Sequence, residues 1–150
     1  MPLIVRRVKI QDIPTPEQFE ADNVKRFPAR AGWMEAYRRV VEKSLSEEPE
    51  GILVAEYDGR PIGCAVVRAR EHHPVTGVKY GQLMTLTVAH GWKGQGVDTR
   101  LLRETEAYLR SRGCESIALT LPADAGEDAD LFKTAGYRVL GWELERNLKG

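Results

Sequence analysis

Cysteine is scarce in this chain, and the little there is does not form a recognisable motif. The sequence holds two cysteines, Cys64 and Cys114, which make no C-x-x-C pair. Nothing in this usage indicates a disulfide framework or a dithiol redox site. We therefore expect both thiols to be small buried hydrophobes in a protein of the reducing cytoplasm.

Long apolar runs and an excess of one charge are also missing. No apolar run approaches the ~20 residues that span a bilayer, and the N-terminal MPLIVRRVKIQ lacks the continuous hydrophobic core of a signal peptide. Lys and Arg number 22 and so do Asp and Glu, so no basic field suggests a nucleic acid or an anionic membrane as partner. At 150 residues without an internal repeat, the chain is expected to form a single domain, residues 1–150.

What the sequence does contain is a strand, a glycine-rich turn and a helix in direct succession. In QLMTLTVAHGWKGQGVDTRLLRETEAYLRSR, residues 82–112, an apolar run with β-branched threonines fits a strand buried on both faces. Three glycines, Gly91, Gly94 and Gly96, mark its end. From Val97 the apolar residues recur at helical spacing, and Gly113 stands where a C-terminal cap glycine belongs.

Such a junction can bind an anion. The first turn of a helix offers unpaired backbone N–H groups and about half a positive charge, and glycines allow an anion to approach them closely. A phosphate or pyrophosphate is the expected ligand. Neither G-x-G-x-x-G nor G-x-x-x-x-G-K-S/T occurs here, which disfavours a dinucleotide fold and a phosphate-loop hydrolase.

Two short motifs resemble the signatures of the GNAT N-acetyltransferase superfamily. Lys93-Gly94-Gln95-Gly96-Val97-Asp98 is similar to its acetyl-coenzyme A loop, which reads Arg or Gln, two residues, Gly, one residue, Gly or Ala. The loop follows Val88 at the family's spacing. Later, Leu131-Phe132-Lys133-Thr134-Ala135-Gly136-Tyr137 resembles the family's second signature, Leu-Tyr-x-x-x-Gly-Phe. The two motifs stand in the family's order.

Patterning along the rest of the chain agrees with that fold in order and spacing. The expected strands are Leu3–Ile10, Ile52–Tyr57, Ile62–Ala69, 83–88, Ser116–Leu121 and Val139–Leu148, and the expected helices are 15–26, 32–45, 97–112 and Asp128–Ala135. Asp58-Gly59 between two of the strands is typical of a tight hairpin turn. The resemblance implies an α/β fold with a mixed sheet, splayed after the fourth strand, and helices on both faces.

The resemblance also implies a function and a site. The function would be N-acetyl transfer from acetyl-CoA to a primary amine of a small molecule or protein, the alternative being a weak or inactive acyl-CoA- or protein-binding module. Backbone N–H groups near Leu86 and Thr87 would hold the thioester carbonyl, and Thr99 would offer a hydroxyl to a phosphate or cap the helix. The implied cofactor-binding residues are Leu86, Thr87, Val88, Lys93, Gly94, Gln95, Gly96, Val97, Asp98, Thr99 and Phe132. A homodimer is a fair expectation.

Asp98 departs from the loop pattern, which has Gly or Ala there. A carboxylate ~6 Å from a phosphate would repel it by roughly 1 to 3 kcal/mol. Alternatively, an acidic residue in the first helical turn stabilises the helix as a cap or dipole partner and can point to solvent. Lys93 in place of Arg is milder, because it keeps the charge but loses the bidentate fork.

Phe132 is the second departure, because many family members have a tyrosine there that protonates the leaving thiolate. Phenylalanine cannot donate a proton. Tyr80, just before the central strand, is a weak candidate for that role. Met84 and Thr85 lie where the family often has a glutamate base, so the sequence identifies no general base.

Other side chains have a chemical and a plainer interpretation. His72 and His73 could act as a base near neutral pH, but their turn-rich surroundings favour a surface loop, and they lack the spaced partner of a zinc site. Trp33 and Tyr37 belong to an apolar helical stripe typical of a core. In the family this helix borders the acceptor pocket, so one or two of its residues could line it.

Overall fold

The structure is a computed structural model that describes residues 3–9, 12, 33–121 and 126–149. The expected helix at 15–26 lies outside these residues. The chain divides into two compact units, Met1–Leu119 and Thr120–Gly150. Each unit is described by itself.

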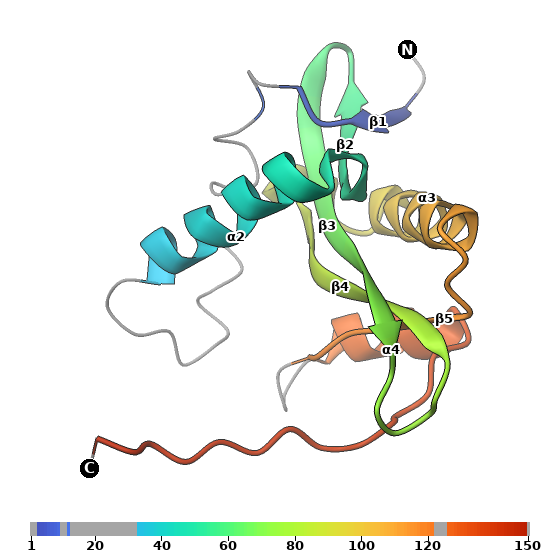
Figure 1. The fold of residues 1–150 in the computed structure, drawn as a ribbon. Coiled ribbons are helices and arrows are strands. Elements are labelled where there is room, and N and C mark those ends of the chain that lie inside the picture. The colour runs from blue at the N-terminus through green and yellow to red at the C-terminus, as the bar shows by residue number, and fades with distance from the viewer. Residues whose placement is uncertain (1–2, 10–11, 13–32, 122–125, 150) are drawn as a thin grey trace. The chain divides into compact units, whose positions relative to one another are not determined.

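The first unit is built on a five-stranded mixed sheet with the order β1-β2-β3-β4-β5 (Figure 1). Its strands are β1 (Ile4–Arg7), β2 (Ile52–Tyr57), β3 (Arg60–His72), β4 (Lys79–Val88) and β5 (Ser116–Ala118). Strands β1 to β4 are antiparallel neighbours, whereas β4 and β5 are parallel. The predicted fold class is confirmed, although β1 and β5 are shorter than the sequence patterns suggested.

The predicted hairpin joins β2 to β3 through Asp58 and Gly59. Both residues have positive φ, 52° and 76°. Such values suit the right-handed twist of the two strands, and Asp and Gly tolerate them better than most residues.

Helices α2 (Trp33–Glu47) and α3 (Val97–Ser111) lie against opposite faces of the sheet (Figure 1). On one face, Val41 of α2 packs in a core cluster with Ile52, Cys64 and Val66. On the other, a Cβ at Gly63 would lie 2.9 Å from Leu101 of α3. Adjacent residues of a strand point to opposite faces, so Gly63 and Cys64 mark the two sides.

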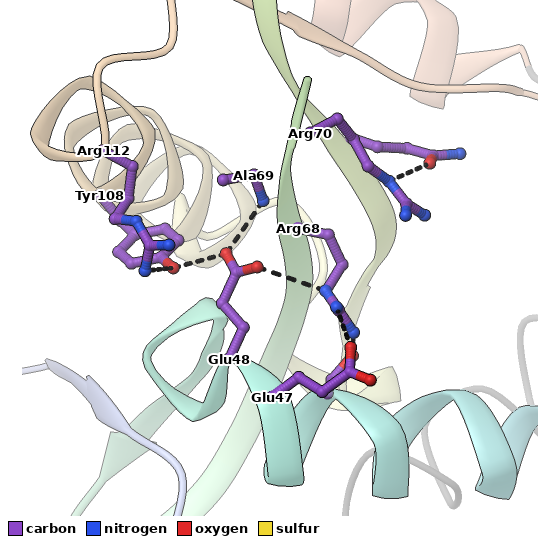
Figure 2. Close-up of polar contacts among 9 residues, drawn as sticks. Glu47, Glu48, Arg68, Ala69, Arg70, Tyr108 and Arg112 are labelled. Carbon is purple, nitrogen blue, oxygen red and sulfur yellow. Dashed lines mark hydrogen bonds and ion pairs between the residues drawn. The ribbon is translucent and has the colours of Figure 1, made fainter.

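A buried polar cluster anchors the C-terminal end of α2 (Figure 2). Glu48 is 5% exposed, and its carboxylate accepts hydrogen bonds from the Ala69 backbone N–H at 2.9 Å and the Tyr108 hydroxyl at 2.5 Å. The guanidinium of Arg68 lies 3.3 Å away. Burial and the Glu48 carboxylate raise the pKa of Tyr108. The cluster therefore ties α2, β3 and α3 together.

Both cysteines are buried, as expected, and no disulfide joins them. Burial raises the pKa of the Cys114 thiol, which keeps it in its neutral form. No helix among the described residues is long and apolar enough to cross a membrane.

The second unit contains α4 (Glu127–Thr134), close to the predicted helix at 128–135. Gly136 follows it with a φ of 97°, which explains the glycine in the second signature. The predicted strand at Val139–Leu148 is wrong for this structure, because the segment pairs with no described strand. Its alternating apolar residues are exposed, Trp142 at 90%. An alternating pattern supplies one apolar face, but a strand also needs an edge to pair with.

Candidate cofactor site

The turn between β4 and α3 has the backbone shape that an anion site requires. After the short 3₁₀ helix η4 (His90–Trp92), Gly94 and Gly96 adopt φ values of 77° and 83°. A Cβ added to either glycine would meet no atom within 4 Å, so this side of the turn is open to a ligand. We call residues 93–98 the amide cradle.

The backbone donors of the amide cradle are available. Among the described residues, none of the N–H groups from Gly94 to Asp98 donates a hydrogen bond to another residue. They lie at the N-terminal end of α3, whose macrodipole adds partial positive charge. Buried Val97 fixes the start of the helix. A diphosphate therefore fits the cradle.

The Asp98 carboxylate already accepts a hydrogen bond from one backbone N–H next to the amide cradle. Its Oδ1 accepts the backbone N–H of Thr99 at 2.7 Å and lies 3.4 Å from the Thr99 hydroxyl. This is the local role that suits an acidic residue in a first helical turn. It also places a negative charge beside the groups that would face a phosphate.

The two other polar side chains of the cradle differ in their contacts. The Gln95 side-chain amide donates to the Gly91 carbonyl at 3.1 Å and so closes the turn on itself. Lys93 is exposed and extends the positive charge of the site. Next to the turn, Trp92 packs on Tyr57 of the hairpin, with ring centroids 4.9 Å apart.

Strand β4 leads into the cradle with one edge open. It pairs with β5 only through Tyr80, Gly81 and Gln82. Within the described part of the chain, residues 83–88 have β3 as their only strand neighbour. Strand β5 ends at Ala118, so among the described residues the sheet is open beside the part of β4 that leads to the cradle, as the resemblance implied.

One hydrogen bond shows which residues of this stretch direct their backbone N–H and C=O groups toward the open edge. The Ala89 N–H donates to the Ile62 carbonyl beside β3 at 2.7 Å. Because polar backbone groups alternate along an antiparallel strand, Thr87 and Thr85 also face β3, while Leu86 and Val88 present N–H and C=O at the open edge. A pantetheine arm could pair with these two residues.

A bulge in β4 determines which side chains next to the open edge lie on the α2 face of the sheet. The register passes from Val66↔Thr85 to Val67↔Leu83, which leaves Met84 as the extra residue. Beyond it, Thr85 and Thr87 share the α2 face with their partners Val66 and Cys64. The Tyr37 hydroxyl of α2 lies 3.5 Å from the Thr85 Oγ1. Tyr37 and Thr85 enter the sequence interpretation separately, and no sequence pattern indicated that they lie close together.

The remaining candidates lie elsewhere. Tyr80 packs edge-on against His73, with ring centroids 4.8 Å apart, and lies six residues before Leu86, about 20 Å along the strand. Phe132 belongs to the second unit, where its ring contacts Tyr137 at 5.2 Å. Across the described residues, no group of three or more His, Cys, Asp and Glu could hold a metal ion.

These features define a class of protein. A mixed sheet open along β4, with helices on both faces, is the fold of the GNAT N-acetyltransferases. Solved structures agree. A GCN5-related N-acetyltransferase from Ralstonia eutropha superposes with a TM-score of 0.77 at 19% identity, covering 99% of this chain and 100% of that one. An aminoglycoside N-acetyltransferase, AAC(6')-Iy in complex with CoA, does so with a TM-score of 0.78 at 15% identity, covering 99% and 96%.

Sequence comparison identifies the family. The chain matches the Acetyltransferase (GNAT) family over residues 9–137, and it belongs to that family. Probable N-acetyltransferase 14 of Xenopus tropicalis is 31% identical over 91 residues, which cover 60% of this chain and 42% of that protein. The chain spans about half the length of two curated relatives that it matches, 42% of Probable N-acetyltransferase 14 and 58% of Acetyltransferase plu1384 of Photorhabdus laumondii.

Proposed function

We propose that this protein is an N-acetyltransferase that moves an acetyl group from acetyl-CoA to a primary amine of a small molecule or protein. The observation that carries the proposal is the continuity of two binding surfaces. The open edge of β4, with the backbone of Leu86 and Val88 unpaired among the described residues, runs directly into the amide cradle. One surface suits a pantetheine amide chain and the other a diphosphate.

Each part of the cofactor has a matching part of the chain. The N–H groups of the amide cradle would hold the diphosphate, with Lys93 adding charge and the Thr99 hydroxyl adjacent. The backbone of Leu86 and Val88 would pair with the pantetheine arm as a strand neighbour would. In the related AAC(6')-Iy, the structure holds CoA. Because the family model covers residues 9–137, we assign both units to one acyltransferase domain.

The transfer needs a neutral amine and a leaving thiolate. The amine nitrogen attacks the thioester carbonyl carbon, so a C–N bond forms and the C–S bond breaks. The thiolate leaves with the bonding electron pair, and the amine passes a proton to water as the amide forms. The Leu86 N–H at the open edge would stabilise the oxyanion. Water returns a proton to the thiolate, so the protons balance without a proton-donating side chain.

A second candidate function is acyl-CoA or protein binding without turnover. Two observations favour it: the Asp98 carboxylate beside the cradle, which holds the Thr99 N–H at 2.7 Å, and phenylalanine at position 132. A weakened cradle and a missing proton donor would lower turnover more than they lower folding stability.

Two measurements distinguish the candidates. Calorimetric titration with acetyl-CoA should show binding to the folded protein, and free-thiol release across a panel of primary amines should reveal transfer. Binding with no thiol release above the rate without amine supports the binding module. Absence of acetyl-CoA binding contradicts the acetyltransferase and the acyl-CoA-binding module, and leaves only a module that binds a protein.

A further inference from the structure

The α2 face of β4 carries hydroxyl groups where the strand edge opens. Thr85 and Thr87 follow the Met84 bulge, and both lie opposite residues of the α2-facing core in register with β3. Between them, Leu86 presents its backbone at the open edge. Two side-chain hydroxyls therefore flank the backbone position proposed for the thioester carbonyl.

The Thr87 hydroxyl differs from ordinary core groups in its bonding, and the Thr85 hydroxyl has a long contact. Thr87 is 6% exposed, and its buried Oγ1 has no hydrogen-bond partner within the described part of the chain. Buried hydroxyls usually have a partner, so one without is a candidate for a ligand or water contact. The Tyr37 hydroxyl lies 3.5 Å from Thr85 Oγ1, at the long limit for a hydrogen bond.

The side chain of Tyr37 packs against the core, and this packing fixes the position of its hydroxyl. The ring packs against the cluster of Val41, Ile52, Cys64 and Val66. The Glu48 cluster fixes the C-terminal end of the same helix to β3 and α3. Helix α2 therefore presents the Tyr37 hydroxyl to β4 from a rigid support.

We propose that the hydroxyls of Tyr37 and Thr85 form a positioning pair for the amine acceptor of the transfer. This inference rests on the proposed function. Hydroxyl oxygens accept hydrogen bonds from amine N–H groups, and such a contact leaves the nitrogen lone pair directed toward the carbonyl at the β4 edge. The pair acts by orienting the acceptor, and neither hydroxyl takes the proton permanently.

The inference fits the absence of a carboxylate at this position of β4. The side chains at the bulge and just after it are those of Met84 and Thr85, and neither carries a charge. A hydroxyl pair binds a neutral amine without adding charge, so transfer depends on the fraction of acceptor that is already neutral. Acceptors of low amine pKa are therefore the expected substrate class.

Steady-state kinetics of matched variants test the pair. Tyr37→Phe and Thr85→Val each remove a hydroxyl and keep the shape, whereas Thr85→Ser keeps the hydroxyl. We expect the first two to lower kcat/KM for the amine about tenfold or more, with the Kd for acetyl-CoA within about twofold of wild type. Thr85→Ser should retain most activity. The double variant should be little worse than either single one, because the pair acts as a unit.

Controls and outcomes separate this inference from the proposed function. Thr105→Val is the matched control, since the Thr105 hydroxyl donates to the Leu101 carbonyl within α3 at 2.8 Å. Transfer that is unaffected in Tyr37→Phe and Thr85→Val overturns the positioning pair and leaves the acetyltransferase intact. Equal losses for Thr85→Ser and Thr85→Val indicate a packing role and also overturn it. Wild-type protein that does not bind acetyl-CoA overturns the proposed function itself.

Discussion

Gly96 is the residue on which the amide cradle most depends. Its φ of 83° places it in the left-handed region at the first residue before α3, and its missing side chain leaves the approach open. Gly91, three residues before Gly94, has an ordinary φ and equally open surroundings. Because the space around both glycines is open, comparing alanine substitutions at the two positions tests the requirement for positive φ alone.

For Gly96→Ala we expect a loss of stability of roughly 1 to 2 kcal/mol, because an alanine is strained at this φ. Affinity for acetyl-CoA should fall at least about tenfold as the cradle distorts. Gly91→Ala is the control and should change neither property appreciably. Urea denaturation and calorimetric titration measure the two effects. Similar effects of both substitutions would contradict a specific requirement at Gly96.

Asp98→Ala removes the negative charge beside the cradle and frees the Thr99 N–H. If the carboxylate repels a diphosphate at ~6 Å, the affinity for acetyl-CoA should rise about five- to a hundredfold. The gain should shrink at high salt, because screening weakens the original repulsion. Helix α3 should lose about 0.5 to 1 kcal/mol, since Asp98 serves its first turn. Unchanged affinity at low salt would show that Asp98 does not oppose the ligand.

At the scale of elements, two adjacent glutamates at the end of α2 contact the same arginine in different surroundings. Glu47 bonds Arg68 at 2.6 Å with its side chain 49% exposed, while Glu48 lies 3.3 Å from Arg68 with its side chain 6% exposed (Figure 2). Solvent screens the first pair. The second is buried and also satisfies Ala69 and Tyr108.

Glu48→Ala should therefore cost roughly 3 to 5 kcal/mol, because it leaves the Arg68 charge and two donors without their buried acceptor. Glu47→Ala should cost at most about 1 kcal/mol. Tyr108→Phe, which leaves the carboxylate with its other partners, should fall between at about 1 to 3 kcal/mol. Chemical denaturation of the three variants provides the comparison. Equal costs for Glu47→Ala and Glu48→Ala would show that burial does not decide the contribution.

For the whole molecule, the Arg6–Asp12 pair predicts how stability depends on pH. The Asp12 carboxylate accepts hydrogen bonds from Arg6 at 2.7 and 3.2 Å and from the Lys9 backbone at 2.7 Å. The Arg6 hydrogen bond is the main cause that holds the pKa of Asp12 below its usual value of 3.8. A lowered folded-state pKa stabilises the protein above the unfolded-state pKa, and this contribution is lost as pH falls through the folded value.

Asp12→Asn should accordingly be less stable than wild type by about 1 to 3 kcal/mol at pH 7. The difference should shrink below about pH 4, as the wild-type carboxylate takes up its proton. Urea denaturation from pH 7 to pH 2.5 follows both proteins. A difference that stays constant across this range would contradict the role of the charged carboxylate.

Local chemistry explains what could be predicted from the sequence. Gly96 and Gly113 were identifiable because their positions require positive φ, and the Asp58-Gly59 hairpin follows from the same preference. Helical periodicity predicted α3, and the hairpin signature around Asp58-Gly59 predicted β2 and β3. The amide cradle belongs to this group, since it consists of one turn and the helix after it.

The sequence by itself determined the family, the order of most elements and the amide cradle, because these depend on residues close together in the chain. Only the tertiary structure decided the open edge of β4, the Met84 bulge and the approach of Tyr37 to Thr85. Each depends on strand register or on helix packing between distant segments. The segment Val139–Leu148 shows the same limit, because its alternating pattern could not supply the neighbouring strand that it needs.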